Sequence, residues 1–358
     1  MIRKITRKIR VGNVTVGGDS PVSVQSMTKT DTRDVGRSLE QIRSLVMAGC
    51  EIVRIALPDE TAALAFKEIR MNTNVPLVGD IHFNHNLALK AILYGADCIR
   101  INPGNIADPE KLRIIIGAAK EKGISMRIGV NGGSLEKDLL ERYKGPTAEA
   151  LLESISRHVG FFEREGFSEF KVSLKSSDVA TSIEASRMFS RKFDYPIHVG
   201  ITEAGSIFAG TVKSSVGIGT LLSEGIGDTL RVSITGPPEE EVRVGQEILK
   251  ALGLRKKGPE IISCPTCGRL EVDLEGIINQ VEVKLSHVDD YIKIAIMGCV
   301  VNGPGEATEA DIGVACGKGV GLLFVDGKVV RKLKEEEIVS ELVTQVEKVL
   351  AKRQRGAC

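Results

Sequence analysis

The chain lacks both a long apolar run and an excess of one charge. No apolar stretch in its sequence approaches the roughly 20 residues that span a bilayer. The basic start, MIRKITRKIR, is not followed by the apolar segment of a signal peptide. Lys and Arg total 48 against 47 for Asp and Glu, so no overall field attracts nucleic acid or an anionic membrane. We therefore expect a cytoplasmic protein without a membrane partner, in which any anion site is local.

Aromatic residues are scarce as well, at 4% of the chain. Proteins that bind single-stranded nucleic acid stack bases on aromatic side chains, so this composition argues against a nucleic-acid partner. The hydrophobic fraction of 42% and the charged fraction of 27% are ordinary for a soluble globular enzyme.

The cysteines lack two familiar arrangements, a second C-x-x-C pair and the radical-chemistry motif C-x-x-x-C-x-x-C. Their number, seven, is odd, which argues against a disulfide framework and for a reducing compartment. What is present is one pair, Cys264 and Cys267, followed further along the chain by Cys299. Three thiolates select soft metals, so the pattern predicts an iron-sulfur cluster, with structural zinc as the alternative.

Three sulfurs leave a fourth ligand position open. Glu306 follows Gly303-Pro304-Gly305, and we expect a turn there that brings its carboxylate back toward Cys299. A carboxylate is a weaker ligand than a thiolate, so an iron that it holds could open for chemistry. Cys316 is the rival fourth ligand.

Short β-rich runs alternate with amphipathic segments of helix length, which is typical of parallel βαβ units. Eight such units predict an α/β fold, a TIM (β/α)8 barrel. The open doubly wound sheet is the structural rival, but no glycine-rich dinucleotide fingerprint follows the first run. The expected strands are 22–28, 51–57, 76–82, 98–102, 125–131, 170–175, 197–202 and 229–235.

A second, smaller domain is expected after a polar linker at residues 255–259. We place the barrel at residues 1–257 and an α+β cluster domain at 258–358. In the second domain we expect a strand into Cys264, a helix at 274–285, a strand at 291–297, a hairpin at 321–333 and a terminal helix from 335. Ahead of the barrel, alternating residues around Gly12-Asn13 predict a hairpin within residues 3–18.

Polar side chains occupy the expected strand ends, where barrel enzymes carry their active sites. Cations recur there, and so many would not lie inside an apolar core without a partner, which points to a polyanion such as a diphosphate. The alternative for each cation is an ion pair with a neighbouring strand. These cations are Arg54, Arg100, Arg127, Lys175 and Arg231.

Glu203, after the seventh run, is a candidate proton donor if burial raises its pKa. The alternative is that it pairs with Arg231 or Lys175. His82 and His198 are candidate substrate contacts, or structural histidines.

The sequence resembles the 4-hydroxy-3-methylbut-2-enyl diphosphate synthase family, the iron-sulfur oxidoreductases of the methylerythritol phosphate route to isoprenoids. The resemblance covers essentially the whole chain. The length of the chain matches the compact two-domain bacterial form of the family. It is carried by VQSMT, IVRIALP, LVGDIHF, IRINPGN, MRIGVNGGS, KVSLKSSD, HVGITEAG, LRVSIT, ISCPTCGR and MGCVVNGPGE.

The resemblance implies a four-iron four-sulfur cluster on Cys264, Cys267, Cys299 and Glu306. It implies 2-C-methylerythritol 2,4-cyclodiphosphate as substrate, opened with two electrons from reduced ferredoxin or flavodoxin, and Glu203 as proton donor. It also implies a head-to-tail homodimer, in which the cluster domain of one subunit covers the barrel mouth of the other. The implied substrate-binding residues are Arg54, Asp80, His82, Arg100, Asn102, Arg127, Asn131, Lys175, Arg231 and Ser233.

Overall fold

The computed structural model describes residues 2–102, 106, 108–299, 301 and 303–356. The chain divides into two compact units, Met1–Arg255 (unit 1) and Lys256–Cys358 (unit 2). Among the described residues, none of the helices combines the length and the apolar character that crossing a membrane requires.

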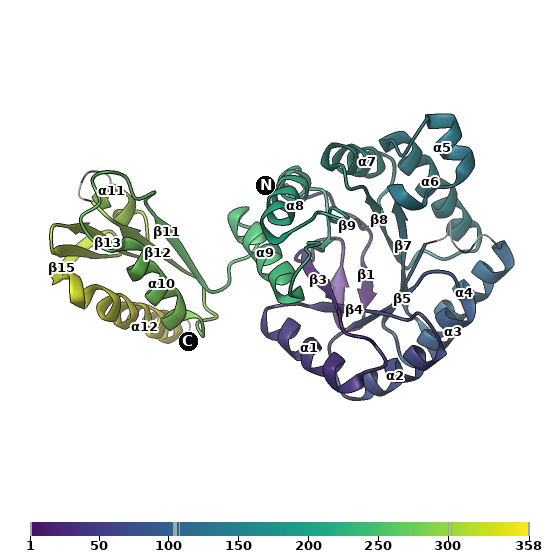
Figure 1. Ribbon diagram of the computed structural model, residues 1–358, viewed down its shortest axis with the longest axis horizontal. Coiled ribbons are helices and arrows are strands. Elements are labelled where there is room, and N and C mark those ends of the chain that lie inside the picture. The colour runs from purple at the N-terminus through teal and green to yellow at the C-terminus, as the bar shows by residue number, and fades with distance from the viewer. Residues whose placement is uncertain (1, 103–105, 107, 300, 302, 357–358) are drawn as a thin grey trace. The chain divides into compact units, whose positions relative to one another are not determined.

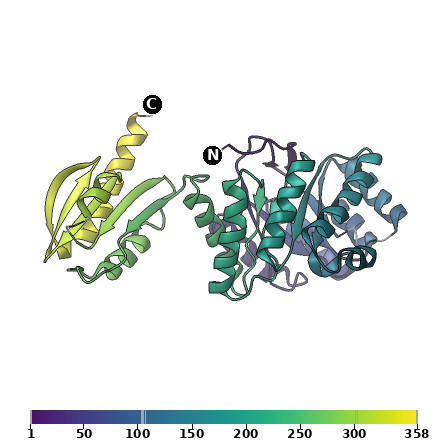
Figure 2. The same ribbon diagram turned by 90° about the horizontal axis from the view of Figure 1, so that it is seen from above.

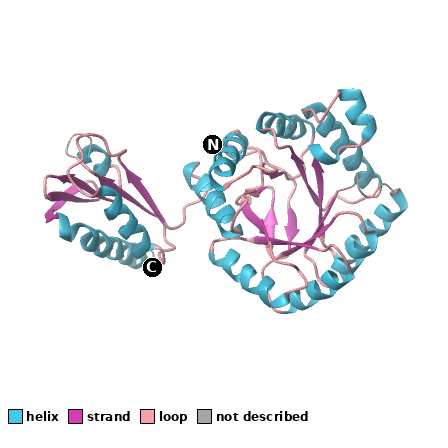
Figure 3. Ribbon diagram, viewed as in Figure 1, coloured by secondary structure: helices cyan, strands magenta, loops and turns pink. Residues whose placement is uncertain are grey.

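Unit 1 is the predicted TIM barrel, with helices around a ring of parallel strands (Figures 1 and 3). Its strands pair in the order β8-β7-β6-β5-β4-β3-β10-β9, and a parallel bridge between Val172 and Ile197 joins the two ends of this order. The strands are β3 (Ser23–Met27), β4 (Ile52–Ala56), β5 (Leu77–Ile81), β6 (Cys98–Ile101), β7 (Ser125–Asn131), β8 (Phe170–Lys175), β9 (His198–Val199) and β10 (Thr229–Leu230). The helices are α1 (Val35–Met47), α2 (Glu60–Met71), α3 (His85–Leu93), α4 (Pro109–Lys122), α5 (Lys137–Tyr143), α6 (Ala148–Arg164), α7 (Val179–Lys192), α8 (Ile207–Ser223) and α9 (Pro238–Ala251).

Side-chain caps explain where many of these helices begin. Asp34, Asp59, Asp108 and Asp178 each accept a hydrogen bond from a backbone N–H in the first turn of α1, α2, α4 and α7. Such caps satisfy donors that the helix itself leaves unpaired. Each cap therefore marks the end of a loop that leads from a barrel strand to the next helix.

The predicted N-terminal hairpin is confirmed as β1 (Ile9–Val11) and β2 (Val14–Val16), which turn at Gly12 with φ +58°. Its apolar side chains pack against Ile52, Val78 and Cys98, near the first residues of three barrel strands. The hairpin thus covers the end of the barrel opposite the strand ends that carry the cations.

The last two barrel strands are shorter than the sequence predicts, since β9 ends at Val199 and β10 at Leu230. A Cβ at Gly200 would clash with the carbonyl oxygen of Arg231, so the two segments approach closely where regular pairing stops. Beyond that point Glu203 has φ +52°, a left-handed conformation. Glu203 therefore lies on a loop.

Unit 2 is a five-stranded sheet with the order β11-β12-β13-β14-β15, parallel among the first three strands and antiparallel among the last three. Helices α10 and α12 share one apolar core with the sheet, and Figure 2 shows the terminal helix, in yellow, running along it. The elements are β11 (Pro259–Ser263), α10 (Leu274–Leu285), β12 (Ile292–Met297), α11 (Gly303–Thr308), β13 (Ile312–Gly317), β14 (Val320–Val325), β15 (Lys328–Lys334) and α12 (Ile338–Gly356).

Two elements of unit 2 were not predicted, strand β13 and helix α11. The isolated turn expected at 303–305 is the first part of this short helix. Gly303 is buried there, and a Cβ on it would lie 3.0 Å from that of Ala315 and 3.1 Å from that of Met297. The glycine lets the helix lie directly on β12 and β13, a reason that the local sequence does not reveal.

Candidate active site

The barrel interior gathers the predicted cations. Arg54 lies on β4, Arg100 on β6, Arg127 on β7 and Lys175 at the end of β8, while Arg231 directly follows β10. Arg127 is only 2% exposed and Lys175 9%. Burying so many positive charges is costly unless anions offset them.

Asp80, at the carboxyl end of β5, is the acid among them. Its carboxylate lies 3.2 Å from Arg100 Nη1, 3.7 Å from Arg54 Nε and 3.4 Å from His82 Nε2. Burial alone would raise the pKa of Asp80, but Arg54, His82 and the other nearby guanidiniums together hold it far below its usual range. Asp80 is therefore ionised, and it offsets part of the positive charge.

Arg127 retains unused hydrogen-bonding capacity. Its Nε and Nη1 atoms are buried and have no partner among the described residues. Burial, followed by the charges of Arg54 and Arg100, lowers its pKa well below the usual value. The pKa of Lys175 is also lowered well below its usual value, by burial and then by the charge of Arg127. An anion bound beside Arg127 and Lys175 would raise both pKa values, because it favours their charged forms.

Arg231 has a partner that the sequence did not suggest. Its Nε and Nη2 atoms donate to the carboxylate of Glu241, in the first turn of α9, at 3.2 and 3.4 Å. Arg231 thus pairs with Glu241 on a helix and not with Glu203. The alternative of an ion pair with a neighbouring strand holds instead for Arg54 and Arg100, which face Asp80 on β5. Acidic residues are common at helix starts, so nothing in the sequence distinguished Glu241 from its neighbours. Ser233, on the same segment, is half-buried.

A cavity of about 440 Å³ opens beside these cations, and five predicted residues line it: His82, Arg100, Asn102, Asn131 and Glu203. Asn102 donates to Ser134 Oγ at 2.7 Å. Glu203 is exposed. The sequence did not single out the other lining residues, which are Gly132, Gly133, Ser134, Pro146, Ser176, Ser177 and Thr202.

His198 does not line this cavity. It is fully buried on β9, and neither ring nitrogen has a hydrogen-bond partner in the described part of the chain. Burial, and then the charges of Lys175 and Arg127, hold its pKa well below the usual value. His198 is therefore neutral inside the barrel.

The cysteines of unit 2 follow neighbouring parallel strands. Cys264 comes directly after β11, and Cys299 comes two residues after β12. The backbone N–H of Gly298 donates to Cys264 Sγ at 3.3 Å. A Cβ at Gly298 would lie 3.4 Å from this sulfur and would require the Leu270 side chain to move. Cys267 is exposed.

These residues fit a thiolate-bound cluster in ligand type and in their placement on adjacent strands. A closed cage is not formed, because no three potential ligands lie close enough to hold an ion among the described residues. Glu306 is exposed in α11. Cys316 is buried in the core shared with α10 and α12, and burial raises the pKa of its thiol to about 12. Cys316 is thus better suited to packing than to metal binding.

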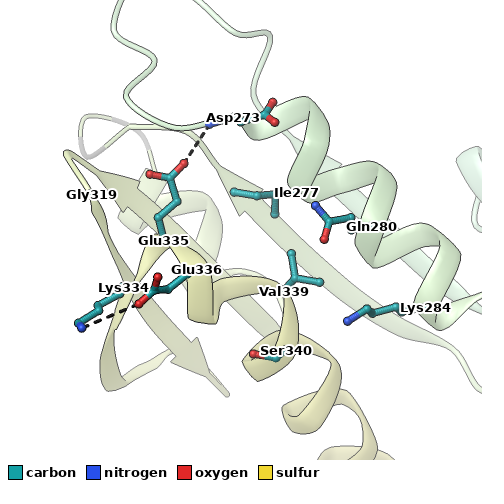
Figure 4. Close-up of a pocket in the computed structure, with 10 residues that line it drawn as sticks. All are labelled: Asp273, Ile277, Gln280, Lys284, Gly319, Lys334, Glu335, Glu336, Val339 and Ser340. Atoms are coloured by element: carbon teal, nitrogen blue, oxygen red, sulfur yellow. Dashed lines mark hydrogen bonds and ion pairs between the residues drawn. The ribbon is translucent and has the colours of Figure 1, made fainter.

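A second cavity, of about 630 Å³, lies between α10 and the start of α12 (Figure 4). The backbone N–H of Asp273 donates to Glu335 there, at 3.2 Å. Lysines and glutamates both line it, and no cysteine does. This cavity is separate from the predicted cluster ligands.

Two family models match the chain. The GcpE TIM-barrel domain matches residues 6–246, and the GcpE protein C-terminal domain matches residues 260–348.

Curated relatives match nearly end to end and are named 4-hydroxy-3-methylbut-2-en-1-yl diphosphate synthase (flavodoxin). The Geobacter sulfurreducens protein is 55% identical over 97% of this chain and 99% of its own length. The Clostridium acetobutylicum protein is 56% identical over 97% and 99%. The Clostridium perfringens protein is 56% identical over 98% and 100%.

Solved structures resemble the barrel in fold alone. Dihydropteroate synthase from Stenotrophomonas maltophilia matches with a TM-score of 0.51 and 12% identity, over 69% of this chain and 97% of that one. Type I 3-dehydroquinate dehydratase from Clostridium difficile matches with a TM-score of 0.51 and 15% identity, over 70% and 98%.

Proposed function

Because this chain belongs to the GcpE family, we propose that it is an iron-sulfur oxidoreductase of isoprenoid precursor biosynthesis. It converts 2-C-methyl-D-erythritol 2,4-cyclodiphosphate to (E)-4-hydroxy-3-methylbut-2-enyl diphosphate. The reaction consumes two electrons and two protons, opens the ring at a carbon–oxygen bond and releases one water. The observation that carries the proposal is the group of buried cations, in which two donors of Arg127 have no partner among the described residues.

The barrel residues bind and orient the diphosphate. Arg127 and Lys175 are both buried, and an incoming phosphate oxygen would satisfy the two Arg127 donors that lack a partner among the described residues. Guanidinium groups suit this role because they donate two parallel hydrogen bonds to phosphate oxygens. Arg54, Arg100, Arg231 and Ser233 complete the diphosphate site in this proposal. A diphosphate held on several strands fixes the remainder of the substrate in position.

The cavity rim holds the carbon skeleton and moves the proton. Asp80, His82, Asn102 and Asn131 offer polar contacts to the hydroxyl groups of the substrate. Glu203 projects from its loop into the same cavity and donates a proton to the hydroxyl that leaves as water.

We propose that Cys264, Cys267, Cys299 and Glu306 hold a [4Fe-4S] cluster, with Glu306 as the replaceable ligand. When bound, such a cluster supplies electrons and a Lewis-acidic iron. Gly298 contributes by donating its backbone N–H to the Cys264 sulfur, which orients this ligand.

Reduced flavodoxin is the proposed electron donor, as the names of the relatives suggest, with ferredoxin as the alternative. The absence of a disulfide framework in the sequence fits a reducing compartment, and we place the enzyme in the cytoplasm. We also propose a head-to-tail homodimer. Mixing an Arg127→Met variant with a Glu306→Ala variant tests it, because activity returns only if each site takes residues from two subunits.

The test of function is anaerobic purification followed by analysis of iron, sulfide and zinc. We expect about four irons and four sulfides per chain. The electron paramagnetic resonance spectrum of the reduced protein should change when the cyclic diphosphate is added, and product should form with reduced flavodoxin. Stoichiometric zinc without iron would overturn the redox assignment and leave a phosphate-binding barrel with a structural zinc domain.

A further inference from the structure

Glu241 is a buried carboxylate that collects contacts from three parts of the barrel. Its side chain is 1% exposed. It accepts hydrogen bonds from Ser26 Oγ at 3.1 Å, from Arg231 Nε at 3.2 Å and from the backbone N–H of Ile234 at 3.2 Å. Lys29 Nζ lies 3.0 Å from Oε1, the oxygen that also accepts from Ile234. The carboxylate is therefore fully engaged, and its charge is offset by two cations.

The segment that Glu241 holds has little support from the sheet. Strand β10 ends at Leu230, so Arg231 and Ser233 lie outside it. Backbone hydrogen bonds fix the two ends of the segment, from Arg231 N to Val199 O and from Thr235 N to Gly205 O. Between these points, Glu241 binds both the Arg231 side chain and the Ile234 amide. It takes the place of the missing strand pairing.

The position of Glu241 on α9 makes this restraint strong. It lies in the first turn of the helix, where the helix dipole favours a negative charge. Its contacts with Arg231 use Nε and Nη2. This leaves Nη1 of that guanidinium, in the described part of the chain, to bind an oxyanion. A guanidinium held in this way loses less conformational freedom when a phosphate binds.

We propose that Glu241 is a positioning residue for diphosphate binding, which acts through Arg231 and the segment that carries Ser233. The inference rests on the proposed function, because it names the residue that pre-organises the same site. Lys29 joins this arrangement by donating to the carbonyl oxygens of Ile234 and Gly236 at 2.8 and 2.7 Å.

Glu241→Gln is the first test, and Glu240→Gln is its matched control. Glu240 lies in the same helical turn, but its carboxylate pairs with Arg243, a residue that is 67% exposed. We expect the KM of Glu241→Gln for the cyclic diphosphate to rise about tenfold or more, with kcat changed much less. Glu240→Gln should match the wild type. Unchanged KM in Glu241→Gln would overturn the proposal.

A double-mutant cycle separates positioning from a general loss of structure. Arg231→Gln should raise KM, and adding Glu241→Gln to it should cause little further increase, because both changes remove one arrangement. Fully additive effects would contradict the proposal. If Glu241→Gln melts early, Ser26→Ala replaces it. This variant removes one donor without leaving a charge unpaired, and it should raise KM about two- to threefold. Wild-type KM in Ser26→Ala would then count against the inference.

Binding of inorganic pyrophosphate, measured calorimetrically, distinguishes failure of this inference from failure of the proposed function. We expect Glu241→Gln to bind it about tenfold more weakly than the wild type or Glu240→Gln. Equal affinity in all three proteins would overturn the inference. A selective loss in Glu241→Gln, without turnover of the cyclic diphosphate by the wild type, would support the inference and reject the proposed reaction.

Discussion

Asp80 Oδ1 lies 3.2 Å from Arg100 Nη1, and both side chains are buried in the barrel. The same carboxylate also faces Arg54 and His82. Asp80 and the buried Glu241 beside Arg231 therefore offset only part of the charge of the barrel cations. The interior remains positive overall, which suits a ligand with more than one negative charge.

Asp80→Asn is expected to destabilise the fold by about 3 kcal/mol or more, because it leaves buried guanidiniums without their anion. Urea denaturation measures the change. Inorganic pyrophosphate should restore part of the loss, since it supplies negative charge at the same place. Asp19→Asn is the control, because it removes an exposed ion pair with Lys8 and should leave stability unchanged. If Asp80→Asn is as stable as the wild type, the buried guanidiniums do not depend on this carboxylate.

Arg127→Met should move stability and affinity in opposite directions. Methionine has a similar length and removes a buried charge, two of whose donors have no partner in the part of the chain that the structure describes. Replacing such a charge by an apolar side chain is often stabilising, by about 1 to 4 kcal/mol, so Tm should rise. KM for the cyclic diphosphate should rise as well, because the phosphate loses a deep contact. A lower Tm with unchanged KM would place Arg127 outside the binding site.

The sequence predicted the barrel and most of this site because its signals there are local. Polar residues at the ends of consecutive parallel strands must meet at one edge, so Arg54, Arg100 and Arg127 converge as expected. Glu241 was missed because it reaches Arg231 from a helix, and a run of three glutamates at a helix start is unremarkable in sequence. The early end of β10 was missed because it depends on the packing of Gly200 against a neighbouring segment.

For the cysteine segments, the sequence predicts the type of ligand but not the local structure. Their residue types predict the ligand chemistry, whereas the helix that carries Glu306 depends on a glycine packed against two strands. That contact joins the helix to two separate strands, β12 and β13, so a turn motif alone could not predict it.

His198 should make the protein less stable as the pH falls below about 6.5. The folded state keeps this side chain neutral, because burial and the charges of Lys175, Arg127, Lys171 and Arg54 lower its pKa. The unfolded chain takes up a proton near pH 6.5, so it gains about 1.4 kcal/mol per pH unit below that value relative to the folded state. Asp80 adds to this loss of stability only below about pH 4, where its carboxylate becomes protonated in the unfolded chain.

His198→Gln removes this titration. Thermal unfolding measured from pH 8 to pH 4.5 should show a flatter pH dependence in the variant between pH 6.5 and pH 4.5. Above pH 7, the Tm of the variant and the Tm of the wild type should change with pH in the same way. Identical slopes throughout would mean that His198 is protonated in the folded state.

Alkylation should divide the cysteines into two groups. In the metal-free protein, iodoacetamide is expected to modify the exposed Cys267 first, then Cys264 and Cys299. Cys50 and Cys316 should resist, because burial raises the pKa of both thiols to about 12. Cys358 lies outside the described residues, so a variant without it is used. Reconstitution with iron and sulfide should protect the first group, and mass spectrometry of the peptides would show whether Cys316 is protected instead.

In the proposed ligand set, Glu306→Ala removes the replaceable ligand and leaves the three cysteines, so the variant should retain iron and lose most turnover. We expect activity to fall about 10- to 100-fold or more, as is common when a metal site loses a tuning residue. The electron paramagnetic resonance spectrum of the reduced protein should also differ from that of the wild type. Glu309→Ala, an exposed change just beyond the same short helix, is the control and should leave both properties intact. Full activity in Glu306→Ala would remove the carboxylate from the reaction, and the structural zinc alternative would then explain the cysteines better.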